Sequence, residues 1–261
     1  MKDLKILKIG GSIITKKDRD NPSPDLEQME KVAEEIKEGI SNVSGLILVH
    51  GAGSYGHPIV KRTGINKGIT NKEDRINFAE TQRLQNELNS IFTEVLIGKG
   101  VPAFPVQPSA SAIMEGKLER MDVEVINGLL DEGLVPVLYG VPAYDRERGC
   151  SILSGDEIMP YLARELDAGT VLHGTNVDGI YTSDPNENPD AELIEKVESM
   201  EEVRDRVGGS KDTDVTGGML NKVEEIVDMG ISGRIFNASR PGNIIKALRG
   251  EEVGTYIESV D

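Results

Sequence analysis

Short apolar runs alternate along this chain with longer segments whose apolar residues recur every three to four positions. The short runs, such as residues 4–9 and 45–49, predict buried strands. The longer segments, such as 25–40 and 72–98, predict amphipathic helices. Strands separated by helices usually form a parallel sheet with helices on both faces. We therefore predict an α/β fold, a three-layer αβα sandwich with a mainly parallel open sheet.

The rest of the chain continues this alternation. We predict strands at 101–106, 134–140, 169–174, 233–238 and 254–259, a hairpin at 111–119 turning at Glu115-Gly116, and helices at 122–131, after Ser154 and at 218–229. Ser23-Pro24 suit the start of helix 25–40, since Ser is a common N-cap and Pro is favoured in the first turn. We find neither a repeat nor a low-complexity linker, and predict a single domain over residues 1–261 with an internal division near 170.

Composition excludes several classes of function. Acidic residues outnumber basic ones by 45 to 29, and the formal net charge is −16. Because this field repels other polyanions, we predict neither nucleic acid nor membrane as a partner. The single cysteine, Cys150, excludes an intramolecular disulfide and a cysteine-based zinc site. No apolar run approaches the ~18 residues of a membrane helix, and the start lacks the apolar core of a signal peptide, so we expect a soluble, cytoplasmic protein.

Residues 51–56, Gly-Ala-Gly-Ser-Tyr-Gly, follow a predicted strand and match the dinucleotide-binding pattern G-x-G-x-x-G. That pattern requires an acidic residue at the end of a second strand about 20 residues later. Glu73 and Asp74 lie at that distance, but they open the predicted helix 72–98. The sequence thus argues against NAD. Two interpretations stay open: a plain strand–helix turn, or a loop whose glycines bring backbone N–H groups close to an anion beside His57.

Three further glycine turns accompany this one. They lie at 8–12, 154–157 and 214–219, after a strand or at the start of a helix. The carboxyl ends of parallel strands meet at one edge of a sheet, where ligands bind. Lysines near these turns, in a strongly acidic chain, are candidates for phosphate contacts: Lys8, Lys17 and Lys222. Positioning and charge stabilisation are what phosphoryl transfer requires of a protein.

Five separated stretches carry a resemblance to a known family. They are KIGGS (8–12), VHGAGSYGH (49–57), ILSGDEIM (152–159), NVDGIYTSDP (176–185) and DVTGGMLNK (214–222). In this order and spacing they resemble the amino acid kinase superfamily, in the form of the archaeal-type isopentenyl phosphate kinases. The resemblance implies a homodimer that transfers the γ-phosphate of ATP, with Mg²⁺, to isopentenyl phosphate. It also implies an acceptor-binding lobe at 1–170 and a nucleotide-binding lobe at 171–261.

Carried over to this chain, the resemblance implies roles for individual residues. The catalytic group would be Lys8, Lys17, His57, Asp156 and Lys222. The nucleotide would contact Lys8, Gly10, Gly11, Ser12, Gly53, Thr175, Asp178, Gly179, Tyr181, Gly218 and Lys222. The acceptor phosphate would contact Ala52, Gly53, His57 and Gly155. Asp156 would orient lysines without acting as a base, because a phosphate acceptor is already anionic, and no residue is assigned as a metal ligand.

Some features leave alternatives open. Asn176 stands where the family often has Asp, and Ala52 where related subfamilies often have Gly. An apolar tail on the acceptor would be met by Ile76, Phe78 and Ile152, although ordinary core packing explains them equally. A sister kinase acting on glutamate, UMP, carbamate or a phosphonate such as fosfomycin is one alternative function. A nucleotide sensor without catalysis is another.

Overall fold

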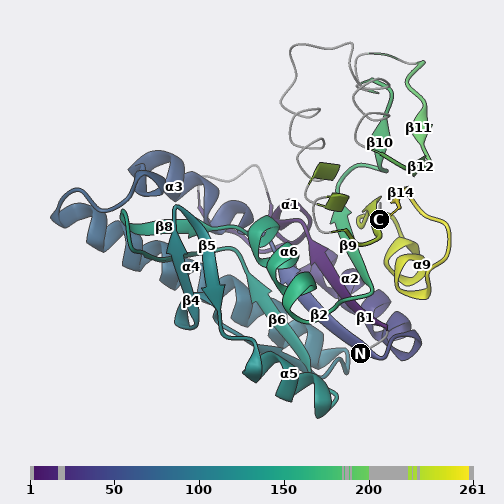
Figure 1. The fold of residues 1–261 in the computed structure, drawn as a ribbon, viewed down its shortest axis with the longest axis horizontal. Coiled ribbons are helices and arrows are strands. Elements are labelled where there is room, and N and C mark those ends of the chain that lie inside the picture. Colours follow the sequence, from purple (N-terminus) through teal and green to yellow (C-terminus); the bar gives the residue numbers. More distant parts are fainter. Residues whose placement is uncertain are drawn as a thin grey trace.

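The structure is a computed structural model that describes residues 3–16, 21–183, 185, 188, 190–199, 223–224, 226–227 and 230–258. It confirms the α/β sandwich (Figure 1). Among these residues, eight strands form the central sheet, in the order β12-β14-β13-β9-β1-β2-β6-β3. They are β1 (Leu4–Ile9), β2 (Gly45–His50), β3 (Ala103–Pro105), β6 (Val135–Tyr139), β9 (Thr170–Thr175), β12 (Lys196–Val197), β13 (Gly233–Asn237) and β14 (Thr255–Ile257). The pair β13–β14 is antiparallel, and the other described neighbours are parallel.

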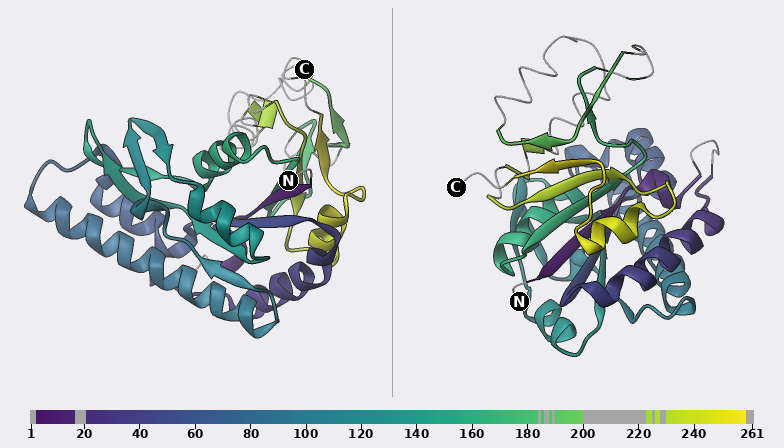
Figure 2. Two further views of the ribbon diagram at one scale, coloured as in Figure 1. Left: turned by 60° about the horizontal axis from the view of Figure 1, so that its bottom comes forward. Right: turned by 90° about the vertical axis from the view of Figure 1, so that its right-hand side faces the viewer.

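Helices cover both faces of this sheet (Figure 2). One face carries α2 (Leu26–Gly39), α4 (Lys72–Gly98) and α9 (Asn243–Arg249), and the other carries α5 (Glu124–Asp131) and α6 (Gly155–Glu165). Strand β1 shows why both faces are filled. Leu7 and Ile9 pack into the core beneath α2, whereas Leu4 and Ile6 belong to the core beneath α6. The alternation is the two-residue period of a strand buried on both sides.

The same alternation sends two lysines of β1 in opposite directions. The ammonium group of Lys5 donates to the carbonyl of Leu248 in α9, at 2.6 Å. Lys8 instead extends toward α6, on the opposite face. Both residues are 8% exposed, and burial lowers the pKa of Lys5. Each of the two helical layers therefore receives one buried cation from the central strand.

A second described sheet stands beside the first, above one end of α4. Its order is β5-β4-β7-β8, with β4 (Ala112–Glu115), β5 (Lys117–Met121), β7 (Val141–Asp145) and β8 (Gly149–Leu153). The hairpin turning at Gly116 was predicted, but the β7–β8 hairpin was not. The Asp145 carboxylate fixes both turns, since it accepts bonds from the N–H groups of Gly116, Glu147 and Arg148.

The remaining described elements are short. They are α1 (Gly11–Ile14), α3 (His57–Thr63), the ribbon β10 (Ile180–Tyr181) with β11 (Leu193–Ile194), and 3-10 turns at Ile40–Asn42, Gly53–Tyr55, Ile65–Lys67 and Pro108–Ala110. Helix α2 starts one residue after the predicted bound of 25, and its N-cap is Asp25 instead of Ser23, because the carboxylate of Asp25 accepts from the N–H of Gln28 at 3.3 Å. Most of the predicted helix 218–229 lies outside the described residues.

The turns after β1 and β2 touch backbone to backbone. A Cβ atom placed on Gly11 would lie 2.2 Å from the backbone nitrogen of Gly53. One placed on Gly51 would lie 2.6 Å from the nitrogen of Gly11. Gly53 also has a φ of +51°, which L side chains rarely adopt. Glycine is therefore required here for close packing, independently of any ligand.

We expect Gly11→Ala to lower the free energy of unfolding by about 1–3 kcal/mol, as overpacking does in cores. Gly128→Ala, inside α5, is the matched control, because a Cβ there meets nothing within 4 Å. Alanine in a helix interior should raise stability by roughly 0.5–1 kcal/mol. Urea unfolding of both variants checks the contrast. Equal effects at the two positions would contradict the close contact of the turns.

His50 ends β2 immediately before the second turn and is fully buried. Its ring stacks on Tyr139 at 5.4 Å and meets the edge of Phe92 at 5.7 Å. Nδ1 donates to the carbonyl of Gly51 at 3.1 Å, and Nε2 lies 3.1 Å from the side-chain amide oxygen of Asn89. Burial lowers the pKa of His50 from 6.5 to about 4. The histidine is therefore a neutral, structural support for the 51–56 turn.

This pKa predicts a specific pH dependence. Between pH 6.5 and 4 the unfolded chain binds a proton at His50 that the folded chain excludes, so stability is lost as the pH falls through this window. The lost contribution amounts to about 3 kcal/mol at most. We expect His50→Gln to be less stable than the wild type at pH 7, with a deficit that shrinks toward pH 4. Urea unfolding at several pH values measures this difference, and a deficit that does not change with pH would refute it.

Candidate active site

A cleft of about 1020 Å³ opens where β1, β2 and β9 end. Ten of the predicted site residues line it: Lys8, Gly10, Gly11, Ser12, Ala52, Gly53, His57, Gly155, Asp156 and Thr175. The glycine turns at 8–12, 51–56 and 154–157 thus converge on one place, as parallel strand ends should. Lys17, Gly218 and Lys222 lie outside the described residues.

Lys8 and Asp156 form an ion pair in this cleft. The distance from Lys8 Nζ to Asp156 Oδ1 is 2.5 Å, with side-chain exposures of 10% and 29%. Asp156 lies in the first turn of α6, whose N-terminus is capped by Ser154 and Glu157 in a reciprocal capping box. A Cβ on Gly155 would lie 3.1 Å from Lys8 Cε, so the glycine leaves room for the lysine chain. The cap, the glycine and the carboxylate together fix the position of one ammonium group.

His173 belongs to the same cluster, and sequence reasoning missed it. It lies in β9, is 1% exposed and lines the cleft. Its Nδ1 is 4.0 Å from Asp156 Oδ1. The available signal was a histidine at the end of a predicted strand, beside the turns that were singled out.

The backbone donors of the first turn divide into two groups. The N–H of Gly10 donates to the carbonyl of Gly174 at 2.9 Å, so it serves the sheet and does not suit the predicted phosphate contact. Gly11 and Ser12 open the short helix α1, where first-turn N–H groups have no acceptor within the helix. These two groups remain candidates for contacts with phosphate oxygens.

Asp178, Gly179 and Tyr181 do not line the cleft in the described part of the chain. Asp178 accepts bonds from Asn237 Nδ2 at 2.9 Å and from the Tyr181 hydroxyl at 3.2 Å, and it forms an ion pair with Arg240. A Cβ on Gly179 would lie 2.6 Å from the hydroxyl oxygen of Thr255. These contacts join the segment after β9 to β13 and β14. They give Asp178, Gly179 and Tyr181 a structural role that requires no bound nucleotide. Asn176, in contrast, does line the cleft.

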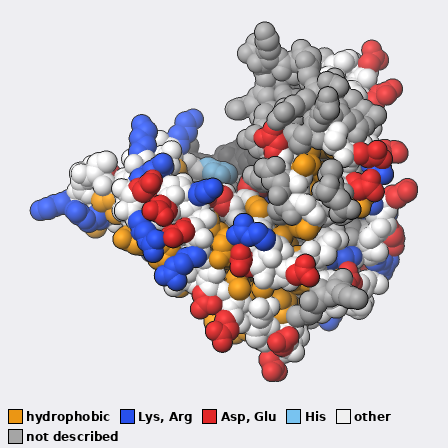
Figure 3. All heavy atoms as spheres, viewed as in Figure 1, with side chains coloured by type: hydrophobic (Ala, Val, Ile, Leu, Met, Phe, Trp, Pro, Cys, Tyr) orange, Lys and Arg blue, Asp and Glu red, His pale blue; other side chains and the backbone are white. Residues whose placement is uncertain are grey.

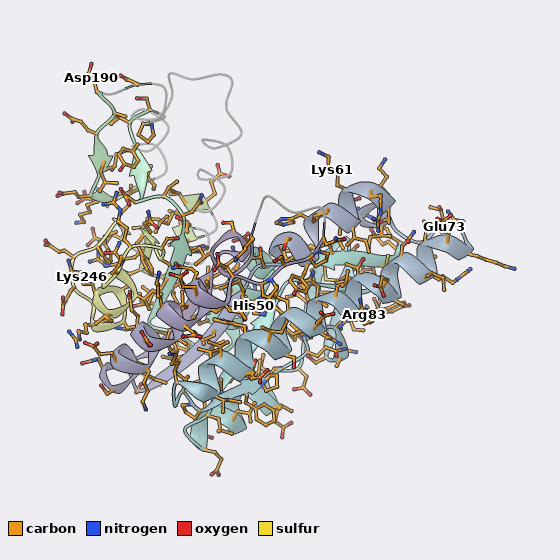
Figure 4. The ribbon with its side chains drawn as sticks, turned by 180° about the vertical axis from the view of Figure 1, so that it is seen from behind. His50, Lys61, Glu73, Arg83, Asp190 and Lys246 are labelled. Carbon is orange, nitrogen blue, oxygen red and sulfur yellow. The ribbon has the colours of Figure 1, made fainter. Side chains whose placement is uncertain are left out.

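The mouth of the cleft is basic, which sequence reasoning also missed. Lys61 and Lys67 line it, and the segment 57–72 contains four basic residues and no acidic one. No ion pair joins these four to another residue within the described ranges. Lys61 projects outward from α3, whereas His50 lies inside the molecule (Figure 4). Lys and Arg side chains gather at this end of the molecule, and acidic ones crowd the other (Figure 3).

The tail-binding prediction needs correction. Ile76 is 70% exposed, and neither it nor Phe78 lines the cleft. Ile152 does line it, together with Val141 and Pro142 of the second sheet. The apolar wall is therefore built by β7 and β8. Ile76 and Phe78, in the first two turns of α4, do not belong to this wall, because the helix reaches the cleft only further along, at Thr81 and Gln85.

The chain is similar to a known protein family and to curated proteins. The amino acid kinase family model matches residues 3–237. The isopentenyl phosphate kinase of Methanothermobacter thermautotrophicus is 41% identical over 97% of this chain and 98% of its own length. That of Methanocaldococcus jannaschii is 37% identical over 98% of each chain.

Solved structures agree with these relatives. X-ray structures of isopentenyl phosphate kinase match with a TM-score of 0.83 and 38% identity, over 97% of this chain and 99% of theirs. The product complex of the Thermoplasma acidophilum enzyme matches with a TM-score of 0.78 and 27% identity, over 98% of this chain and 100% of its own.

In the part of the chain that the structure describes, no helix is long and apolar enough to cross a membrane. The chain belongs to the amino acid kinase family, among the isopentenyl phosphate kinases.

Proposed function

We propose that this protein is a kinase that transfers the γ-phosphate of ATP to isopentenyl phosphate, giving isopentenyl diphosphate and ADP. The observation that carries the proposal is the Lys8–Asp156 ion pair, held at 2.5 Å in a cleft that also contains three glycine turns and His57. The relatives and solved structures that match nearly the whole chain are isopentenyl phosphate kinases. Family and geometry support the same reaction.

The chemistry requires charge stabilisation more than acid–base catalysis. An oxygen of the acceptor's phosphate attacks the γ-phosphorus, and the bond from that phosphorus to the oxygen bridging to ADP breaks. The acceptor is already an anion, so no base has to remove a proton. Lys8 stabilises the negative charge on the migrating group, and Asp156 keeps its ammonium group in position.

The acceptor's phosphate would be bound in the same cleft by the 52–53 backbone and His57, with Gly155 beside it. Lys17, Lys222 and Gly218 keep their proposed catalytic and nucleotide-binding roles on the grounds of the resemblance alone. The same holds for Thr175, whose hydroxyl bonds to the carbonyl of Val177 at 3.0 Å and which lines the cleft.

Mg²⁺ is part of the proposal as the companion of ATP. Among the described residues, no group of three or more His, Cys, Asp or Glu side chains could enclose a metal ion. Asp156, the carboxylate among the described lining residues, is already paired with Lys8. This donor set fits a Mg²⁺ that is bound mainly by phosphate oxygens and water. When bound, the ion neutralises charge on the β- and γ-phosphates.

The proposal includes an acceptor-binding lobe at 1–170 and a nucleotide-binding lobe at 171–261. Residues on both sides of this division, within 8–156 and 173–176, line the cleft. The homodimer and the cytoplasmic location stay predictions from the resemblance and the composition.

The first experiment is an ADP-release assay with ATP and Mg²⁺ against isopentenyl phosphate, dimethylallyl phosphate, fosfomycin, UMP and glutamate. We expect the highest kcat/KM with isopentenyl phosphate, because the cleft joins phosphate-binding turns to the apolar wall of Val141, Pro142 and Ile152. Preference for fosfomycin would favour a phosphonate kinase, which His57 also suits. ATP binding without turnover on any of the five would favour the nucleotide sensor.

A pair of variants on β1 tests the role of Lys8. Lys8→Met should lower kcat by about 10²–10³, the usual effect of removing one charge-stabilising donor. Lys5→Met is the matched control, because Lys5 is buried to the same extent on the same strand but bonds to Leu248 on the opposite face. It should change stability, while the activity per folded molecule stays near that of the wild type. Similar kcat losses in both variants would refute a catalytic role specific to Lys8.

A further inference from the structure

The side chain of Gln85, buried in the wall of the cleft, has no hydrogen-bond partner among the described residues. Thr81 and Gln85, one turn apart on α4, are each 1% exposed and line the cleft. The Thr81 hydroxyl donates to the carbonyl of Asn77 at 2.7 Å. Within the part of the chain that the structure describes, neither Nε2 nor Oε1 of Gln85 has a hydrogen-bond partner. Gln85 therefore holds an unsatisfied amide donor and acceptor, both buried, directly beneath the lining of the site.

The other buried residues along this part of α4 are Leu88, Asn89, Phe92, Thr93 and Leu96. Asn89 lies within hydrogen-bond distance of His50, and among the described residues the hydroxyl of Thr93 also has no partner. Of these two unsatisfied side chains, Gln85 lines the cleft and Thr93 does not. An amide buried without partners costs free energy that an apolar side chain of the same size would avoid. Packing alone therefore does not explain a glutamine at position 85.

The position of the amide indicates its partner. A Cβ placed on Gly56 would lie 2.6 Å from Gln85 Nε2 and 2.5 Å from the Cβ of Ala52. The amide thus lies against the 52–56 turn, which is followed at once by His57. This is the wall that the proposed function assigns to the acceptor's phosphate.

We propose that Gln85 is a positioning and specificity-determining residue for the acceptor. This inference rests on the proposed function. The side-chain N–H group donates to an oxygen of the acceptor's phosphate ester, beneath the 52–57 turn. A hydrocarbon tail laid against Gln85 would leave the amide unpaired, so the tail is directed to the apolar wall of Val141, Pro142 and Ile152.

The main test is Gln85→Met, which keeps the length of the side chain and removes its polar atoms. We expect the KM for isopentenyl phosphate to rise about tenfold, with kcat within about twofold and the KM for ATP unchanged. The free energy of unfolding without substrates should stay equal or increase, because an unsatisfied amide is removed. Gln85→Glu places a negative charge against the phosphate, and we expect it to raise the acceptor KM further, by about 100-fold.

Gln82→Met is the matched control on the same helix. Gln82 bonds to Asn86 at 2.7 Å and to Ser109 at 3.2 Å, and it does not line the cleft. Its replacement should leave the acceptor KM unchanged. If Gln85→Met alters only stability, or alters the KM no more than Gln82→Met does, the inference is wrong.

The experiments distinguish a failure of the proposed function from a failure of the inference about Gln85. Wild-type protein that neither phosphorylates isopentenyl phosphate nor binds it in a calorimetric titration would overturn the proposed function, and the inference with it. Wild-type activity together with an unchanged Gln85→Met variant would overturn the inference alone.

Discussion

The close contact between the turns after β1 and β2 determines where everything else in the site can lie. Gly11 and Gly53 approach so closely that neither tolerates a side chain. This contact brings the end of β1, with Lys8, beside the loop that leads to His57. Because the two strands are parallel neighbours in register, the contact also fixes the depth of the cleft. Glycine here has two roles that are difficult to separate in a sequence, since a tightly packed turn and an anion-binding turn require the same residue.

The sequence predicted the fold well where periodicity is strong. Strand 4–9 and helix 72–98 have the predicted bounds, since each shows an uninterrupted pattern with clear ends. The β7–β8 hairpin was missed although its turn has a local cause, since the Asp145 carboxylate accepts bonds from the N–H groups of Glu147 and Arg148, two and three residues later. The bond from the Gly116 N–H to the same carboxylate joins residues distant in sequence, and no local propensity reveals it.

The site was predictable to a similar degree and for a related reason. Ten residues that the motifs predicted do line the cleft, because the ends of parallel strands converge at one edge of the sheet. They could not show that the Gly10 N–H serves the sheet, or that Asp178 bonds to Asn237. Lys61, Lys67 and Gln85 were missed because their importance comes from the direction in which α3, α4 and the intervening turn face. Single-sequence patterns carry little information about which face of a helix meets a ligand.

The opposed lysines of β1 have a consequence for how this strand pairs during folding. A shift of β1 by one residue would exchange its two faces. Lys5 would then enter the layer of α6 without the Leu248 carbonyl, and Lys8 would enter the layer of α9 without Asp156. Burying two ammonium groups away from their partners is far more costly than exchanging apolar residues. These cations therefore lock the register of the central strand, and one of them also stabilises charge in the cleft.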